Sequence, residues 1–434
     1  MTNRFFCAIG KSYRKTKRRF YAVFGLLYML SFFYFYLQSS IPDRICIGTA
    51  QAGTLNFSVP FDAILSTESQ EVVLTDVSNI PSDRLELTLD KPFEVYAEKE
   101  GSYWLQLKLF GLFHYKDIEL NVLDETEVIP CGNTVGIYLE SDGILVVGTS
   151  AITDEKGELQ NPCGEQLRSG DYIIAVNGKE ISKKEELIRT IDAGCGESLR
   201  LTIRRNQRQI ETEVTPVSVG NDTYRLGIWV RDDTQGIGTL TYMTKDGTFG
   251  ALGHGISDSD VGNIVEIKGG ALYQAQILDI MRGSIGHPGS LSGIICYGEP
   301  QYLGEISENT QSGIFGKADE ALGRWVEGEA MPVAYRQEVH TGPASILSSI
   351  DGTVKEYTVE ITHINQSLYA QNKDMVIQVT DNKLLELTGG IVQGMSGSPI
   401  LQDGKVVGAV THVFVNDPTR GYGIFLEHML ICEK

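Results

Sequence analysis

The chain has 434 residues, too many for one hydrophobic core, so its length indicates two or three domains. Its 47 Gly against 13 Pro, with many Val, Ile and Thr, favour a mainly β protein whose turns are made by glycine. The formal net charge is -19, but residues 1–42 carry seven basic and no acidic residues, which leaves 30 basic against 56 acidic residues elsewhere. Such an acidic body argues against nucleic-acid binding, which depends on Lys and Arg contacts to phosphates.

The first feature in chain order is an uncharged apolar stretch from Phe20 to Leu37, which follows the basic tail of residues 1–19. Its length and the preceding charges predict a transmembrane anchor over residues 20–38, with a cytoplasmic tail and an extracytoplasmic body. A cleaved signal peptide is the alternative, because Ala50-Gln51-Ala52 has a small-x-small pattern, although it lies far from the apolar stretch. We therefore expect a single-pass membrane protein.

Residues 39–125 alternate apolar and polar positions in short runs, such as the segment from Tyr103 to Phe110. This period of two is typical of strands with one buried face. The region is predicted to be a small β-rich spacer domain, and it contains no motif that indicates chemistry.

Residues 126–216 resemble a PDZ domain of the bacterial protease type. Gly170-Asp171 precedes an apolar strand and an Asn177-Gly178 turn, and a helix is expected from Lys183 to Ile191. PDZ domains bind a peptide by adding it to a sheet edge, with backbone N–H groups that hold its carboxylate. The resemblance implies that peptide-binding residues here are Gly136, Ile137, Tyr138 and Leu139.

Residues 217–434 contain short strands separated by Asp-Gly turns, with little helical periodicity. This pattern is typical of a sandwich or barrel, and about 200 residues suffice for a trypsin-like double β-barrel serine peptidase domain. The segment from Gly394 to Ile400, Gly-Met-Ser-Gly-Ser-Pro-Ile, resembles the nucleophile loop of such peptidases. Ser396 is the predicted nucleophile, and the N–H groups of Gly394 and Ser396 are predicted to form the oxyanion hole.

A serine nucleophile needs a base, and His254 lies between two glycines directly after an apolar strand. His287 follows a similar glycine-rich run and is the main alternative, although the adjacent Pro288 indicates a structural turn. For the third member of a triad we select Asp381, which ends an apolar strand, over Asp258, which is close to His254 only in sequence. This chemistry needs no metal or organic cofactor, and the cysteines show no zinc-binding spacing.

Four features together resemble the stage IV sporulation protein B peptidase family. In chain order they are an apolar N-terminal span, a PDZ-like region, the segment Gly-Ala-Leu-Gly-His-Gly-Ile and the segment Gly-Met-Ser-Gly-Ser-Pro-Ile. The resemblance assigns the catalytic histidine, aspartate and serine to His254, Asp381 and Ser396. It implies an endopeptidase in the forespore membrane that faces the intermembrane space. Its expected substrates are itself, recognised through the PDZ domain, and an extracytoplasmic regulator of an intramembrane metalloprotease in the sigma-K checkpoint of sporulation.

Two other functions are compatible with the same motifs. The first is a non-enzymatic PDZ tether with a degenerate peptidase region, and the second is a general quality-control protease of the cell envelope. Covalent labelling by a fluorophosphonate would separate the enzyme from the tether.

Overall fold

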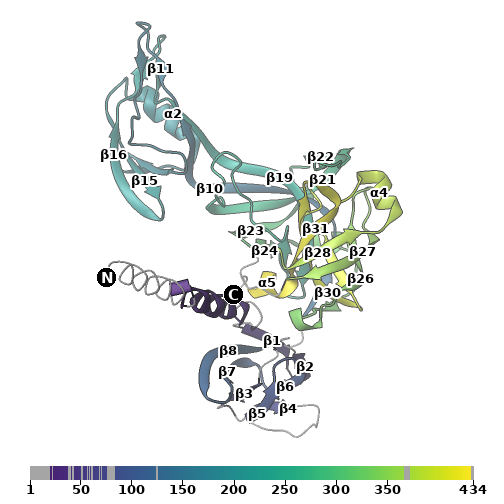
Figure 1. The fold of residues 1–434 in the computed structure, drawn as a ribbon. Helices are drawn as coiled ribbons and strands as arrows, with labels where there is room; N and C mark the ends of the chain where they lie inside the picture. The colour runs from purple at the N-terminus through teal and green to yellow at the C-terminus, as the bar shows by residue number, and fades with distance from the viewer. Residues whose placement is uncertain are drawn as a thin grey trace, which may run out of the picture. The chain divides into compact units, whose positions relative to one another are not determined.

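The chain divides into two compact units in the computed structural model, one comprising residues 1–125 with 365–370 and the other 126–364 with 371–434 (Figure 1). The structure describes residues 20–21, 23–37, 41, 44–49, 52–55, 57, 59, 62–67, 69, 71–75, 84–123, 126–365 and 372–431.

The first unit is built from two β-sheets around one apolar core. Strand β3 (Asp62–Thr67) alternates buried and less buried positions, as the period of two in this region predicted. The five-stranded sheet has the order β1 (Arg44–Gly48), β8 (Phe113–Leu123), β7 (Gly101–Leu109), β3 and β5 (Arg84–Thr88). The three-stranded sheet has the order β2 (Ala52–Leu55), β6 (Phe93–Ala97) and β4 (Val72–Thr75). Their inner faces share a core that includes Leu65, Leu74 and Leu105.

The predicted transmembrane anchor, and with it the predicted single-pass localisation, is wrong. Across the described parts of the chain, every helix is too short or too polar to cross a bilayer. The basic tail of residues 1–19 lies outside the described residues.

Two long strands of the second unit, β10 (Thr134–Thr149) and β19 (Ile228–Thr244), pair with each other along most of their length. Beyond Glu140, β10 also pairs with β13 (Tyr172–Val176) and enters a separate apolar core. We call the part around this core the α/β module. Its other elements are β11 (Ile152–Thr153), β12 (Leu159–Gln160), β14 (Lys179–Glu180), α2 (Lys184–Ala193), β15 (Leu199–Arg205), β16 (Arg208–Val214), β17 (Val217–Ser218) and β18 (Tyr224–Arg225).

The helix of the α/β module is fixed to β19 by a buried carboxylate. Asp232, which is 2 % exposed, accepts hydrogen bonds from the backbone N–H of Lys184 at 2.9 Å and from its Nζ at 2.7 Å. The N–H groups at the start of a helix have no partner within it, so this carboxylate satisfies one of them.

The other ends of β10 and β19 belong to a first barrel. Neighbouring strands follow the order β10, β21 (Ile267–Met281), β23 (Tyr302–Thr310), β24 (Gly313–Ala318), β20 (Thr248–Ala251) and β19. Because β19 also pairs with β10, these strands form a closed ring. Strands β9 (Glu127–Pro130), β22 (Ser290–Ile295) and β25 (Met331–Pro332), helix α3 (Glu320–Trp325) and the short 3-10 helices η1 (Glu299–Gln301) and η2 (Arg336–Glu338) complete this part.

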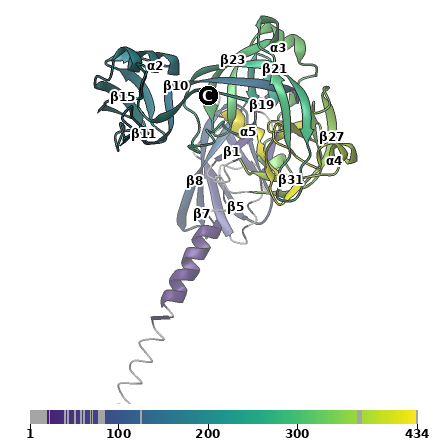
Figure 2. The ribbon, with the colours of Figure 1, turned by 90° about the horizontal axis from the view of Figure 1, so that it is seen from above.

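The C-terminal strands form a second closed barrel, in which β27, β31 and the adjoining α4 lie together in both views (Figure 1 and Figure 2). Ile346, Ile377 and Phe425 are fully buried in its core. The expectation of a mainly β protein is therefore confirmed. The ring order is β26 (Gly342–Ser348), β27 (Lys355–Ile364), β28 (Met375–Val379), β31 (Asp417–Phe425), β30 (Lys405–Phe414) and β29 (Pro399–Gln402), with helices α4 (Asn382–Thr388) and α5 (Leu426–Ile431).

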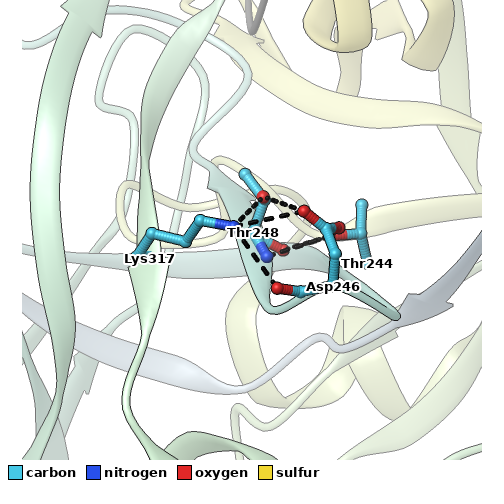
Figure 3. A network of polar contacts seen from close by, with 4 residues as sticks. All are labelled: Thr244, Asp246, Thr248 and Lys317. Carbon is cyan, nitrogen blue, oxygen red and sulfur yellow. Dashed lines mark hydrogen bonds and ion pairs between the residues drawn. The ribbon is translucent and has the colours of Figure 1, made fainter.

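A polar network fixes the turn that joins β19 to β20 in the first barrel (Figure 3). The Asp246 carboxylate accepts hydrogen bonds from the hydroxyls of Thr244 at 2.5 Å and Thr248 at 3.0 Å, and it pairs with Lys317 at 3.1 Å. The hydroxyl of Thr244 and the charge of Lys317 lower the pKa of Asp246 to about 2. The network holds the start of β20, the strand that leads directly to His254.

We predict that Arg205→Ala loosens the α/β module. Arg205 forms two charge-assisted hydrogen bonds, of 2.6 and 2.7 Å, with the carboxylate of Asp171, which is 1 % exposed, so the variant leaves a buried charge without its partner. Such a loss costs about 3 kcal/mol, so amide hydrogen exchange in β13 and β15 should accelerate about 100-fold. Arg208→Ala on the neighbouring strand is the control, and equal exchange in both variants would contradict this role of Arg205.

Candidate active site

His254 lies in a loop that directly follows β20. The chain turns sharply before it, because Leu252 and Gly253 both have positive φ, of 71° and 68°. Beyond the histidine, Asn309 of β23 fixes the loop: its side chain accepts a hydrogen bond from the N–H of Ile256 at 2.8 Å and donates one to the carbonyl of the same residue at 2.9 Å. The imidazole is therefore positioned by the first barrel.

The hydrogen bond of the His254 ring defines its tautomer. Its Nδ1 lies 3.0 Å from the backbone carbonyl oxygen of Gly255. A carbonyl oxygen only accepts, so Nδ1 carries the proton and Nε2 keeps its lone pair. Burial lowers the pKa of His254, which favours the neutral ring. Both effects leave Nε2 ready to act as a base at neutral pH.

Ser396 belongs to the loop before β29 of the second barrel, and this loop is docked against β19 of the first. The Thr239 N–H donates to the carbonyl of Ser396 at 3.0 Å, and the Thr239 hydroxyl donates to the carbonyl of Gly394 at 2.8 Å. Gly397 has a φ of 95°, and a Cβ at this position would lie 2.1 Å from the Thr239 carbonyl oxygen. Glycine is thus required for this close approach.

The backbone of the same loop presents two N–H groups without an internal acceptor. Within the described residues, neither Gly394 N nor Ser396 N donates a hydrogen bond to another protein group. Gly394 has a φ of 105°, a conformation that favours glycine. The N–H groups predicted to form an oxyanion hole are therefore free to bind a ligand oxygen.

His254, Gly394 and Ser396 line one cavity of about 460 Å³ between the two barrels. The Ser396 hydroxyl donates to the carbonyl of Thr411 at 2.7 Å, so it must leave this acceptor before it can donate its proton to an imidazole. The structure brings the predicted nucleophile, base and oxyanion donors together, although they lie about 140 residues apart in sequence.

The structure places the carboxylates that were considered for a triad elsewhere. Asp381 is the N-cap of α4, where its Oδ1 accepts from the N–H groups of Lys383 at 2.9 Å and Leu384 at 3.0 Å. Asp258 is buried against Arg231. Among the described residues that line the cavity there is no aspartate or glutamate.

The residues predicted to bind peptide in a PDZ groove, Gly136 to Leu139, lie inside β10 in the first barrel. Each of them pairs with β19 on one side and with β21 on the other; Ile137, for example, is opposite Gly236 and Leu272. A strand that is paired on both edges cannot accept an added peptide strand. Ile137 instead lines the catalytic cavity.

His412 was not predicted as a site residue, and it lies in the cavity beside His254. The two imidazole centroids are 4.9 Å apart, with ring planes at 33°. Desolvation and the nearby His254 and Lys373 lower the pKa of His412 to about 4, so its ring is neutral at physiological pH. The predicted hairpin after the nucleophile loop could have indicated this residue, because His412 is on β30, the strand that pairs with β29. His287 forms a tight turn with Ser284 and does not line the cavity.

Two comparisons with known proteins match parts of the chain. Residues 222–430 match the family model described as SpoIVB peptidase S55. A crystal structure of the PDZ domain of an SdrC-like protein from Listeria monocytogenes matches with 19 % sequence identity over 21 % of this chain and 90 % of that chain, at a TM-score of 0.18. The matched region holds His254 and the loop with Ser396, and residues 222–430 therefore form a serine peptidase domain of the SpoIVB peptidase S55 type.

Proposed function

We propose that this peptidase is an endopeptidase in which Ser396 is the nucleophile and His254 the general base. The observation that carries the proposal is the shared cavity, where a hydroxyl, a neutral imidazole of defined tautomer and two free N–H groups converge. These are the groups that acyl transfer to a serine requires.

The reaction follows from these positions. His254 Nε2 accepts the hydroxyl proton as Ser396 Oγ bonds to the substrate carbonyl carbon, and the resulting oxyanion accepts hydrogen bonds from the N–H groups of Gly394 and Ser396. The imidazolium then donates its proton to the leaving amine as the peptide bond breaks. Water, activated by the same imidazole, releases the acyl group. Throughout, the Gly255 carbonyl holds Nδ1–H, which is the role of the carboxylate in a triad.

As substrates we propose a protein that restrains an intramembrane metalloprotease during sporulation, and the chain itself. The match to a sporulation peptidase family supports this choice. The active chain, incubated with the Ser396→Ala chain as substrate, should cleave it, which detects self-cleavage in trans. The purified regulator should be cleaved at defined positions, whereas degradation of any unfolded protein at a similar rate would instead indicate quality control.

We predict that Ser396→Ala and His254→Ala each reduce turnover by roughly 10⁴-fold or more, because the two side chains act as one unit. Fluorophosphonate labelling should vanish in Ser396→Ala. His287→Ala, a histidine outside the cavity, is the control and should keep the wild-type rate. Circular dichroism must show that the variants are folded, and a folded Ser396→Ala variant that still cleaves would contradict the assigned nucleophile.

We predict that Asp381 acts on stability rather than on turnover. Asp381→Ala removes the cap of α4 and should cost about 1 kcal/mol, whereas Asp381→Asn keeps a good capping side chain. In both variants, kcat should stay within a few-fold of wild type. A folded Asp381→Asn variant with more than a roughly 100-fold loss of kcat would show that this carboxylate reaches His254 during catalysis.

We predict that kcat/KM begins to fall on the acid side only below pH 6.5, the ordinary pKa of histidine. Burial lowers the pKa of His254, so the neutral base persists at a pH where an exposed histidine is already protonated. Below the lowered pKa, kcat/KM should fall tenfold per pH unit. A pH profile of kcat/KM for a peptide substrate measures this, and the same limit in His412→Gln would assign it to His254 rather than to the second imidazole.

A further inference from the structure

The catalytic cavity has aliphatic walls on both sides of the nucleophile. Ile391 and Val392 precede the nucleophile loop and are 2 % and 1 % exposed, and Val413 follows closely after the carbonyl that accepts the Ser396 hydroxyl. Ile237 and Ile256 of the first barrel lie in the same lining. A substrate side chain next to the attacked carbonyl therefore meets hydrocarbon as soon as it passes Ser396.

The wall made by Ile391 is held rigidly in place. Its N–H donates to the Pro418 carbonyl at 2.8 Å, and its Cδ1 would lie 2.5 Å from a Cβ at position 421. A Cβ at this position would also lie 2.8 Å from the backbone carbonyl oxygen of His412, so glycine is needed in β31 for the close packing of Ile391. Val413 is paired with Gly421 in the barrel, so both walls are tied to one strand.

No described residue in the cavity lining carries a full charge at neutral pH. The only titratable side chains there are His254 and His412, and the pKa of each is lowered. Outside the lining, Lys373 is directed to the Tyr422 ring and Arg420 to the Phe414 ring. A charged substrate side chain would thus be desolvated without a partner of opposite charge, which is costly, whereas an aliphatic one gains from burial.

We propose that this cavity is the primary specificity pocket and that it selects an aliphatic residue, such as Val, Ile or Leu, on the acyl side of the cleaved bond. The inference rests on the proposed catalytic role of Ser396 and His254. Ile391 and Val413 are the specificity-determining residues. Lys, Arg, Asp and Glu at the same substrate position are rejected, because the described lining offers them no group of opposite charge.

The first experiment uses the full chain and a peptide library that varies only the residue before the cleaved bond. Aliphatic peptides should have kcat/KM at least about 100-fold above those with a charged residue. A preference for a basic or acidic residue, or equal rates for all, would overturn the pocket assignment. Loss of all cleavage and of fluorophosphonate labelling in the wild-type chain would instead refute the proposed function, so the two failures are distinguishable.

The second experiment reverses the selectivity. Val413 is only half-buried, so Val413→Asp should fold, should lower kcat/KM for aliphatic peptides at least about tenfold, and should raise that for Lys and Arg peptides. Val354→Asp introduces the same charge at an exposed residue outside the cavity and should leave the preference unchanged. Val413→Ala, which only enlarges the pocket, should shift the preference toward larger apolar residues. Unchanged selectivity in both Val413 variants, with fluorophosphonate labelling intact, would overturn the proposal.

Discussion

The active site depends on the docking of the nucleophile loop of one barrel on a strand of the other. Two hydrogen bonds from Thr239, to the carbonyls of Ser396 and Gly394, tie the loop to β19. The contact is possible only because Gly397 has no side chain at the point where the backbones meet. Gly394 and Ser396, whose N–H groups have no acceptor among the described residues, line the cavity that also holds His254.

The base is organised by a backbone group rather than by an acidic side chain. The carbonyl of Gly255 fixes the tautomer of His254, and the surrounding cavity is free of carboxylates among the described residues. Desolvation lowers the pKa of His254, and the Gly255 carbonyl, which stabilises an imidazolium less than a full negative charge does, opposes this shift only in part, so the neutral ring is favoured. The aliphatic side chains of the cavity lining contribute to the desolvation. Catalytic electrostatics and the proposed substrate selectivity therefore have one physical origin.

Strands β10 and β19 connect the catalytic barrel to the α/β module by continuous pairing rather than by a linker. Consecutive residues of β19 contact both parts: Arg231 pairs with Asp258 in the loop that follows His254, and the buried Asp232 caps helix α2. Both contacts are charge-assisted, and both involve a carboxylate that is removed from solvent. The α/β module and the histidine loop are thus fixed to the same short segment of backbone.

The sequence by itself determined the features that depend on neighbouring residues. The Gly-Met-Ser-Gly-Ser-Pro pattern predicted Ser396 as nucleophile and the glycines around His254 predicted an accessible base, and both residues line one cavity. The alternation of apolar residues predicted strands, and the chain is mainly β. Only the tertiary structure decided the positions that depend on distant contacts. Asp381 was predicted to end an apolar strand, but it lies two residues beyond the end of β28, and the helix that follows takes up its carboxylate. Gly136 to Leu139 have the composition of a binding loop, yet β19 and β21 fill both edges of their strand. His412 lies beside His254 because the second barrel closes and places β30 next to the cavity. The barrel closes through pairings between strands that are far apart in the chain, and no local sequence pattern predicts such pairings.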